Sequence, residues 1–357
     1  MFQTIKKYIL SLSVLAALGA CSHDELEQVN KAQAFRPAGD FIRNNYDLSL
    51  TYAAMQRAGI TEALNGKGPF TVLAPGNTAW NRIGIMRAED FQRLDADSLR
   101  NMLNYHVINR RLLLAEIPVN GIDVRYATLY DNKELFTTFA THQQGYPQYP
   151  QNHLFFNGSY CTKKEVTLAN GTLYVLDKVI KYNPGTVQDW LSKRPEYSLF
   201  VAGLKKFGLW ERLAQAGPFT VFAPENAAFE AAGLDLATLN AMNADAYIGA
   251  RLFGVYIVPR SHYFIGDFLA FNTIYGTGGF TAKIEGDTHN RAIRADRINV
   301  QGDVTYTLSV FTPNDPWSPI GGAMGTVAAR SDFQTDNGLV HNLPQLLIKP
   351  DQARKNQ

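Results

Sequence analysis

The sequence predicts a mixed α+β protein made of two tandem copies of one domain. The first observation is a phrase that occurs twice: Gly68–Trp80 reads GPFTVLAPGNTAW, and Gly217–Phe229 reads GPFTVFAPENAAF. Nine of the thirteen positions are identical, at a constant offset of 149 residues. The second observation is that helix-like and strand-like segments surround both copies in the same order. Repetition of this kind indicates a duplicated structural unit.

The segments upstream of the repeated phrase predict amphipathic helices. Leu50–Pro75 and Leu199–Pro224 align without a gap, and apolar residues recur in both at helical spacing. Gly59 and Gly208 interrupt the two copies at the same place. We expect the helix to end there in a left-handed cap, which glycine adopts most readily.

The repeated phrase itself predicts a strand, a turn and the start of a helix. Its Phe-Thr-Val favours a strand, which Pro75 and Pro224 end because proline cannot donate to a sheet ladder. Asn77 and Asn226 follow two residues later, where a side-chain oxygen can cap the next helix. The aromatic residue that ends each phrase is expected to return to the core. The phrase is therefore predicted to be structural.

Two later segments complete each copy. Leu99–Ile108 predicts a helix that runs into a strand, and its partner is Gly249–Val258. Asn170–Ile180 and Asn337–Leu347 both open with Asn-Gly, a strong hairpin-turn signal, and then alternate like a strand.

In this order the segments resemble the fasciclin (FAS1) domain, here in tandem. Tyr105 and His106 match the family's Tyr-His box. The resemblance implies an α+β fold in which a twisted β-sandwich is wedged against several helices. It implies a mainly structural role for His106, with receptor contact as the alternative. Aligning the copies at Tyr105 places Ile257 opposite His106, which argues against a chemical role that both copies share.

The resemblance and the repeat divide the chain into five predicted parts. These are a signal peptide (1–20), an acidic tether (21–39), a first domain (40–182), a second domain (183–350) and a C-terminal tail (351–357). The last matched segment is offset by 167 residues rather than 149, so the second domain carries 18 additional residues. We expect them as a loop insertion near residues 311–336.

The N-terminus predicts a lipid anchor. Lys6 and Lys7 precede an apolar run that is too short to cross a bilayer, as in a secretory signal. Leu18–Cys21 resembles a bacterial lipobox, with Cys21 as the lipid attachment site; an ordinary signal peptide is the alternative. The acidic stretch after Cys21 resembles the surface-export signal of Bacteroidota lipoproteins, or is a simple solvated tether. We therefore expect a lipid-anchored protein of the outer membrane, exposed on the cell surface.

Composition argues against nucleic-acid binding. The chain has 34 basic and 32 acidic residues, and removing residues 1–20 takes away Lys6 and Lys7, which leaves 32 of each. A balanced chain has no surplus of cations to neutralise phosphates. Cys21 and Cys161 are the two cysteines, so acylation of Cys21 rules out an intramolecular disulfide.

The sequence contains no recognisable catalytic, phosphate-binding or metal-binding motif. The histidines of the two domains are far apart in the chain, without the short spacing of zinc ligands. Asp95 and Asp97 precede a predicted helix, so they indicate a helix start rather than a calcium site. We expect no catalysis, no metal and no cofactor.

Two loops are the candidate binding elements, because loops carry function more often than scaffold positions do. One contains Tyr146 and Tyr149, and the other contains Trp317. Exposed aromatic rings beside Asn and Gln suit sugar stacking or protein contact. The alternative is that both loops pack on their own domains.

These features predict a non-catalytic, lipid-anchored binding or adhesion protein of the cell surface. The resemblance to Bacteroidota lipoproteins implies an accessory subunit that works beside a TonB-dependent, SusC-like barrel and a SusD-like protein in nutrient uptake. The alternatives are a free-standing adhesin for a matrix protein or glycan, a structural scaffold of the envelope, and an enzyme.

Overall fold

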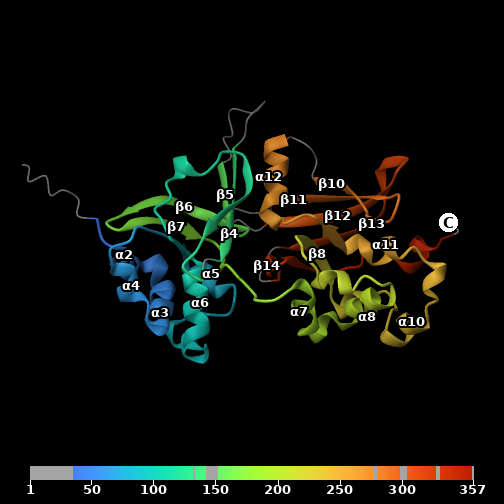
Figure 1. Cartoon of the computed structure of the whole chain (residues 1–357), viewed down its shortest axis with the longest axis horizontal. Coiled ribbons are helices and arrows are strands. Elements are labelled where there is room, and N and C mark those ends of the chain that lie inside the picture. Colours follow the sequence, from blue (N-terminus) through green and yellow to red (C-terminus); the bar gives the residue numbers. More distant parts are fainter. Residues whose placement is uncertain are drawn as a thin grey trace, which may run out of the picture. The chain divides into compact units, whose positions relative to one another are not determined.

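The first half of the chain forms a helical layer followed by a sheet, as the repeat predicts (Figure 1). The computed structural model describes residues 35–131, 133–141, 152–275, 280–297, 304–326 and 330–355. Residues 36–357 form one compact unit that contains both domains. The helices of the first domain are α2 (Ala38–Arg43), η1 (Tyr46–Leu48), α3 (Ser49–Ala58), α4 (Thr61–Asn65), α5 (Asn77–Asn81), η2 (Ala88–Arg93), α6 (Ala96–Tyr105) and η3 (Leu114–Glu116). Its strands are β1 (Phe70–Pro75), β2 (Val107–Ile108), β3 (Gly121–Ala127), β4 (Glu134–Thr141), β5 (Asn152–Phe156), β6 (Ser159–Leu168) and β7 (Gly171–Leu176).

The first sheet is ordered β2-β1-β7-β6-β5-β4-β3, so the last strand of the domain lies beside the strand of the repeated phrase. β1 and β7 run parallel, with Phe70 opposite Gly171 and Pro75 opposite Leu176. The start of β6 pairs with β5 and the rest pairs with β7, and the pairing with β7 contains register shifts after Cys161 and after Lys163. Such irregularities bend a strand, so β6 turns the sheet from one part into the other.

The second domain repeats this arrangement. Its helices are α7 (Val187–Ser192), η4 (Pro195–Tyr197), α8 (Ser198–Lys206), η5 (Glu211–Ala214), α9 (Asn226–Glu230), α10 (Leu236–Ala241), η6 (Ala244–Ala246), α11 (Gly249–Leu252), η7 (Gly254–Tyr256), α12 (Ile265–Tyr275) and η8 (Pro350–Ala353). Its strands are β8 (Phe219–Pro224), β9 (Ile257–Pro259), β10 (Phe280–Lys283), β11 (Asn290–Arg297), β12 (Val304–Thr312), β13 (Asp315–Thr326), β14 (Phe333–Gln334) and β15 (Gly338–Leu343).

The second sheet keeps the order of the first but is divided in two among the described residues. One part is ordered β9-β8-β15-β14 and the other β13-β12-β11-β10. β8 and β15 run parallel, as β1 and β7 do. The division falls where the single strand β6 turns the first sheet, so two strands, β13 and β14, occupy its place.

The helix before each repeated phrase packs one face on the core and ends at the predicted glycine. In α3, Leu50, Ala54 and Met55 are buried. Gly59 and Gly208, which follow α3 and α8, have φ angles of 69° and 70°. Both are left-handed conformations, so the predicted caps are confirmed.

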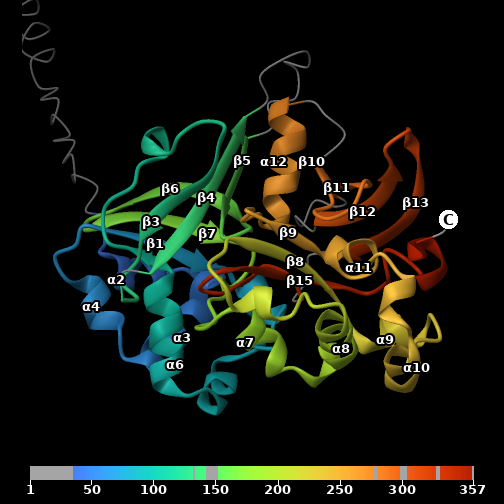
Figure 2. The ribbon, with the colours of Figure 1, turned by 45° about the vertical axis from the view of Figure 1, so that its right-hand side comes forward.

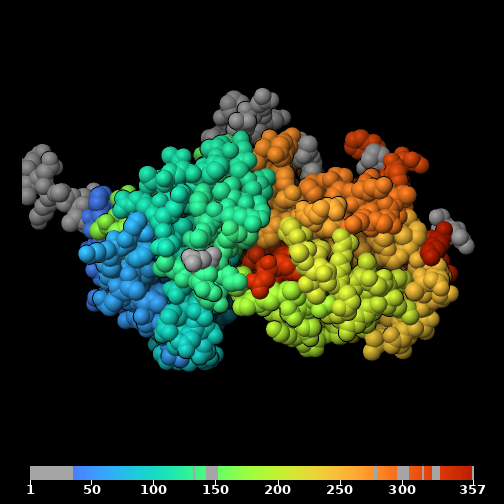
Figure 3. Space-filling model, in the orientation of Figure 1, coloured from blue at the N-terminus to red at the C-terminus, as the bar shows by residue number. Residues whose placement is uncertain are grey.

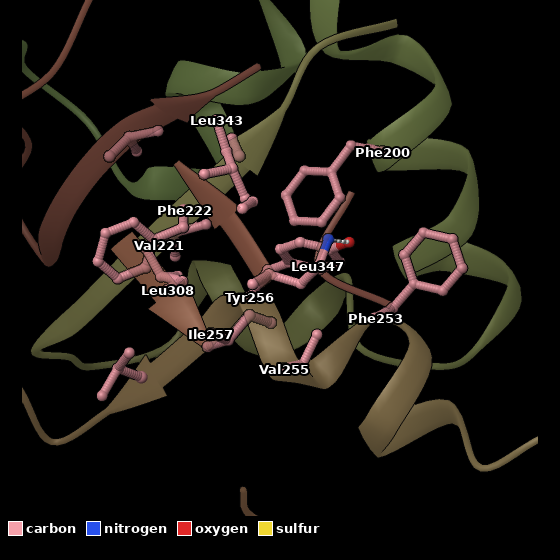
Figure 4. Packing of buried hydrophobic residues seen from close by; sticks show 14 of the residues in the cluster. Phe200, Val221, Phe222, Phe253, Val255, Tyr256, Ile257, Leu308, Leu343 and Leu347 are labelled. Atoms are coloured by element: carbon pink, nitrogen blue, oxygen red, sulfur yellow. Dashed lines mark hydrogen bonds between the residues drawn. The ribbon is translucent and has the colours of Figure 1, made fainter. Parts of the chain in front are cut away.

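The aromatic residues that end the two phrases are both buried, as predicted. Trp80 is fully buried and meets Phe91 edge to face, with ring centroids 5.0 Å apart. Phe229 is buried in the second core, which also contains Phe222 and Tyr256 (Figure 4). Burial of such rings supplies a large part of a domain's hydrophobic stabilisation.

Asn77 and Asn226 do cap helices, but not the helices that they begin. Asn77 Oδ1 accepts a hydrogen bond from Leu50 N, in the first turn of α3, at 3.0 Å. Asn226 Oδ1 accepts one from Leu199 N, in the first turn of α8, also at 3.0 Å. The N-caps of α5 and α9 are the preceding residues, without a side-chain bond. The sequence-based prediction of a local cap was therefore wrong, because each asparagine reaches a helix 27 residues earlier in the chain.

A second pair of asparagines, Asn170 and Asn337, ties the first helix of each domain to its last strand. Asn170 Oδ1 accepts from Ala38 N at 3.0 Å, and its Nδ2 donates to the carbonyls of Leu64 and Gly66 at the C-terminal end of α4. Asn337 Oδ1 accepts from Val187 N at 2.7 Å, and its Nδ2 also donates to two carbonyls. We call these two residues the asparagine clamps.

Most of the additional residues of the second domain lie in the predicted region near 311–336. Fourteen positions separate the turn at Asn157 from the start of β7, whereas 25 separate the turn at Pro313 from the start of β15, so eleven of the eighteen lie there. Leu112 N and Tyr263 N are equivalent, because they donate to Thr71 Oγ1 and Thr220 Oγ1, respectively. Fifteen positions separate Leu112 from the end of β3, whereas twenty separate Tyr263 from the end of β10, and six residues separate each of these strands from the next one. Five additional residues therefore lie before β10, in the part of the chain that forms helix α12 where the first domain has only the short η3.

The inserted segment near 311–336 is largely β-structure rather than the expected loop. Thr312 pairs with Asp315 across a tight turn between β12 and β13. β13 continues to Thr326, and β14 follows at Phe333. Most residues of this segment therefore belong to the sheet rather than to a loop.

Candidate functional site

Three of the predicted site residues, Cys21, Tyr146 and Tyr149, lie outside the described residues. Trp317 lies on β13 just after the hairpin turn, and its side chain is 88% exposed. Its backbone N donates to Asp315 Oδ1 at 3.0 Å, which orders the turn without using the indole. An indole this exposed is available for a partner.

His106 lies in the interior of the first domain with both ring nitrogens engaged. Nε2 accepts a hydrogen bond from Ile180 N at 2.9 Å, and Nδ1 therefore donates to Met102 O at 2.8 Å. Burial lowers the pKa of His106 to about 4, so the ring is neutral at physiological pH. Both ring nitrogens therefore hold backbone groups of the same domain.

Tyr105, beside it, is also buried and bonded. Its hydroxyl donates to Glu134 O at 2.8 Å and accepts from Asn157 Nδ2 at 2.8 Å. Both residues of the Tyr-His box thus join α6 and β2 to later parts of the same domain.

The residue of the second domain that corresponds to His106 is Tyr256, not Ile257. Val72 lies opposite Val107 in the first domain, and Val221 lies opposite Ile257 in the second, which fixes the register. Tyr256 performs the same task, since its hydroxyl accepts from Leu347 N at 2.9 Å (Figure 4). The alignment of Tyr105 with Tyr256 was wrong by one position. In the first domain α6 runs to Tyr105, whereas in the second domain the short helix η7 occupies the corresponding place.

The opposite replacement, of a tyrosine in the first domain by a histidine in the second, occurs in the last strand of each domain. Tyr174, in β7, donates its hydroxyl to Leu112 O at 3.1 Å. His341, at the corresponding position of β15, donates Nε2–H to Tyr263 O at 3.0 Å and accepts from Asp332 N at 3.1 Å. Burial lowers the pKa of His341 to about 4. The histidines of the motif positions therefore serve the scaffold in both domains.

The sequence did not reveal a buried contact between the two domains. α12 packs against β4 and lies beside β5 in both ribbon views (Figures 1 and 2). The space-filling view shows the orange atoms of α12 directly against the teal surface of the first domain (Figure 3). Phe155, from β5, belongs to the core cluster of the second domain, and a Cβ on Gly266 would lie 2.7 Å from its ring.

Three polar pairs cross this contact in the interior. Lys178 Nζ lies 2.6 Å from Asp332 Oδ2, with side chains that are 16% and 6% exposed. Thr138 Oγ1 donates to Asp267 Oδ1 at 2.6 Å, and both residues are buried. His262 Nδ1 lies 2.7 Å from Asp123 Oδ1.

The carboxylates of this interface have different electrostatic environments. Burial raises the pKa of Asp267 to about 8, and its bonds to Thr138 and Phe264 N oppose the shift only in part. Burial also acts on Asp332, but Lys178 and His341 outweigh it and hold the pKa of that carboxyl below its usual range. The interface thus contains one charged aspartate, Asp332, and one neutral aspartate, Asp267.

Three of the described histidines, His106, His262 and His341, have a partner on both ring nitrogens and so no free nitrogen for acid–base chemistry. Besides His106 and His341, His262 has Asp123 on one nitrogen and Gln334 Oε1 at 2.9 Å on the other. Burial raises the pKa of the Cys161 thiol to about 12, so it is not a nucleophile at neutral pH. Within the described ranges, no three His, Cys, Asp or Glu side chains are placed to hold a metal ion.

Asp95 has the helix-start role that was expected of it. Its carboxylate accepts from Ser98 N at 2.8 Å and caps α6. No helix in the part of the chain that the structure describes is both long and apolar enough to cross a bilayer.

The family model of the fasciclin domain matches residues 46–182 and again residues 195–349. The chain belongs to the fasciclin family. Its two fasciclin domains carry the α+β fold that the resemblance implied, and their boundaries enclose the motif residues and the asparagine clamps.

The two fasciclin domains are similar to segments of much longer proteins. Human periostin is 25% identical over 296 residues, which cover 83% of this chain and 30% of periostin. The pig transforming growth factor-beta-induced protein ig-h3 is 26% identical over 304 residues, 85% of this chain and 36% of that protein. Human stabilin-1 is 24% identical over 307 residues, 83% of this chain and 10% of its own length.

Among solved structures, a FAS1 domain pair from the insect cell adhesion molecule fasciclin I matches with a TM-score of 0.38 and 20% identity. The match covers 85% of this chain and 97% of that one.

Proposed function

We propose that this protein is a non-catalytic, lipid-anchored binding protein of the cell surface. Lipid on Cys21 holds it to the outer membrane, and the pair of fasciclin domains presents a binding face to a partner protein. The partner we propose is a TonB-dependent, SusC-like barrel with its SusD-like protein, to which the chain is an accessory subunit of nutrient uptake.

The observation that carries the binding role is the exposed indole of Trp317. Large aromatic side chains are enriched among the residues that dominate protein interfaces, because they bury much area at small entropic cost. Trp317 is 88% exposed on a hairpin whose turn is already ordered by Asp315. The site therefore needs little rearrangement to bind.

The test is mild-detergent extraction of the native membrane, affinity purification through a C-terminal tag, and mass spectrometry. The proposal expects a stoichiometric outer-membrane barrel and a SusD-like protein in the eluate. Trp317→Ala is expected to lower their recovery at least about tenfold, while stability changes by about 0.5 kcal/mol or less.

Tyr46→Ala is the matched control, because Tyr46 is also an exposed aromatic residue, 87% exposed, but lies in the first domain. It should leave the recovery of the partners unchanged. A solitary lipoprotein in the eluate would overturn the uptake role and favour a free-standing adhesin for a glycan or matrix protein. Full recovery with Trp317→Ala would remove the hairpin from the binding face.

A further inference from the structure

The second domain contains a cavity of about 1020 Å³ at a place where the first domain is closed. The cavity lies beside β9 and the turn between β10 and β11. Its lining residues that matter here are Arg251, Arg260, Lys283, Glu285, Asp287 and Arg291. Comparison of the two domains shows how the space arises.

In the first domain, backbone hydrogen bonds close this region. Leu129, in the turn after β3, donates N–H to Val107 O at 2.8 Å. Asn109 donates N–H to Ala127 O at 3.3 Å, and Ile108 forms a bridge with Thr128. The turn between β3 and β4 therefore pairs with β2.

In the second domain, a side chain replaces this backbone pairing. Ile257 corresponds to Val107, and its carbonyl accepts from Arg291 Nη1 at 2.7 Å. The same Nη1 reaches Val255 O at 2.6 Å. Pro259 occupies the position of Asn109 and has no N–H to donate. The turn between β10 and β11 therefore does not pair with β9, and the space between them forms the cavity.

Arg291 is unusual for a buried cation. Its side chain is 1% exposed, yet Nε and Nη2 have no hydrogen-bond partner among the described residues. A buried donor without an acceptor is unfavourable, so the guanidinium of Arg291 is a positive charge in the wall that no acceptor offsets at these two nitrogens.

Neither acid of the cavity, Glu285 or Asp287, makes a hydrogen bond or ion pair with Arg291 among the described residues. Asp287 is held by Arg251, with N–O distances of 2.9 and 3.0 Å. Glu285 is held by Arg212 at 2.5 Å. Each carboxylate is therefore already paired with another arginine.

Three further cations line the cavity or its mouth: Arg260, Lys283 and Lys355. All three are exposed, and none makes an ion pair within the described part of the chain. Together with Arg291 they leave an excess of positive charge on the wall. A concave site with one sign of charge concentrates ions of the opposite sign.

We infer that this cavity binds a small organic anion that carries two or more carboxylate or phosphate groups. Arg260 and Lys283 attract and hold the ligand at the mouth, and Arg291 supplies the deeper positive charge. In the described part of the first domain, backbone pairing fills the corresponding region. The inference is independent of the partner proteins proposed above.

Isothermal titration calorimetry on the purified full chain in detergent tests this inference, with citrate as one probe and inorganic phosphate as the other. We expect one citrate per chain, with binding that weakens as the salt concentration rises. Arg260→Gln combined with Lys283→Gln should weaken binding at least about tenfold. Weaker binding of phosphate than of citrate would point to an organic ligand with several anionic groups.

Lys67→Gln combined with Lys193→Gln is the matched control, because it removes two exposed positive charges far from the cavity. This variant should bind citrate as the wild type does. Equal weakening in both double variants would mean that net charge, not this cavity, is responsible, and the inference would be lost. The absence of heat with both probes would overturn it as well.

Discussion

The two fasciclin domains hold the same backbone groups with different side chains. In the first domain His106 accepts from the backbone N–H of Ile180, and in the second Tyr256 accepts from that of Leu347. One strand away the exchange is reversed, with Tyr174 in the first domain and His341 in the second. The scaffold therefore selects a hydrogen-bonding group at a fixed place, and both an imidazole and a phenol can supply it.

The domains differ most where they serve different purposes. The first closes its β2 edge with backbone bonds, whereas the second leaves the β9 edge open beside Arg291. The second also has α12, which packs against the first domain. The shared positions maintain the fold, and the unshared ones make the contact between domains and the cavity.

The largest expected effect comes from breaking the buried ion pair between the domains. Lys178→Ala leaves the carboxylate of Asp332 in the interior without its cation, which should lower the free energy of unfolding by about 3–5 kcal/mol. Urea denaturation followed by tryptophan fluorescence measures the change. We also expect the transition to broaden, because the domains lose a part of their coupling.

Lys133→Ala is the control for this pair. Lys133 and Asp336 are 3.1 Å apart and also join the two domains, but their side chains are 39% and 41% exposed. Its loss should cost about 1 kcal/mol or less. Equal effects of the two variants would show that the burial of Asp332 does not govern the strength of the contact.

The next effect concerns the dependence of stability on pH. The pKa values of His106 and His341 are lowered to about 4, so their contribution is lost as the pH falls from about 6.5 towards 4. The pKa of Asp267 is raised to about 8, so its contribution is lost as the pH rises from about 4 to 8. Stability should therefore be greatest near pH 6.5 and fall by about 2 kcal/mol by pH 8.

Asp267→Asn separates the alkaline loss of stability from the acidic one, because asparagine does not ionise. Its Oδ1 can accept from Phe264 N as the carboxylate does, and its Nδ2 can donate to Thr138 Oγ1. Denaturation midpoints of this variant should no longer fall between about pH 6.5 and pH 8, while the decline on the acid side remains. An unchanged alkaline decline would assign it to another group.

A smaller effect is expected from the exchanged motif residue. Tyr256→Phe removes the acceptor of Leu347 N without changing the packing of the ring, and should cost about 1–3 kcal/mol. Tyr247→Phe, on a half-buried ring that stacks with Arg354, is the control and should be nearly neutral. If thermal denaturation found no difference between them, Tyr256 would not be the counterpart of His106.

The local features of the fold were predictable because they follow from neighbouring residues. The strand that ends at Pro75, the caps at Gly59 and Gly208, and the burial of Trp80 all follow from propensity and spacing. The helix that Asn77 caps was not predictable, because its partner at Leu50 is known only once the chain has folded back.

The contacts between domains could not be predicted from the sequence either, because their partners come together only when the chain has folded. Lys178 and Asp332 are 154 residues apart, and nothing in the repeat pairs them. One signal was present: Ile265–Tyr275 is apolar on nearly all sides, which is typical of a helix buried between two layers. Pro259 at the position of Asn109 likewise marked an edge that cannot pair, but only the register of β9 gives it this meaning.

The asparagine clamps also have a mechanical consequence. A protein tethered through its N-terminus receives any tension at α2, and Ala38 is joined there to Asn170 at the start of β7. Tension is therefore passed from the first helix into a strand that pairs with β1 along its whole length, from Gly171 to Leu176. The load would be shared by many backbone bonds at once, so the first domain would resist being pulled apart from the N-terminal lipid anchor proposed above.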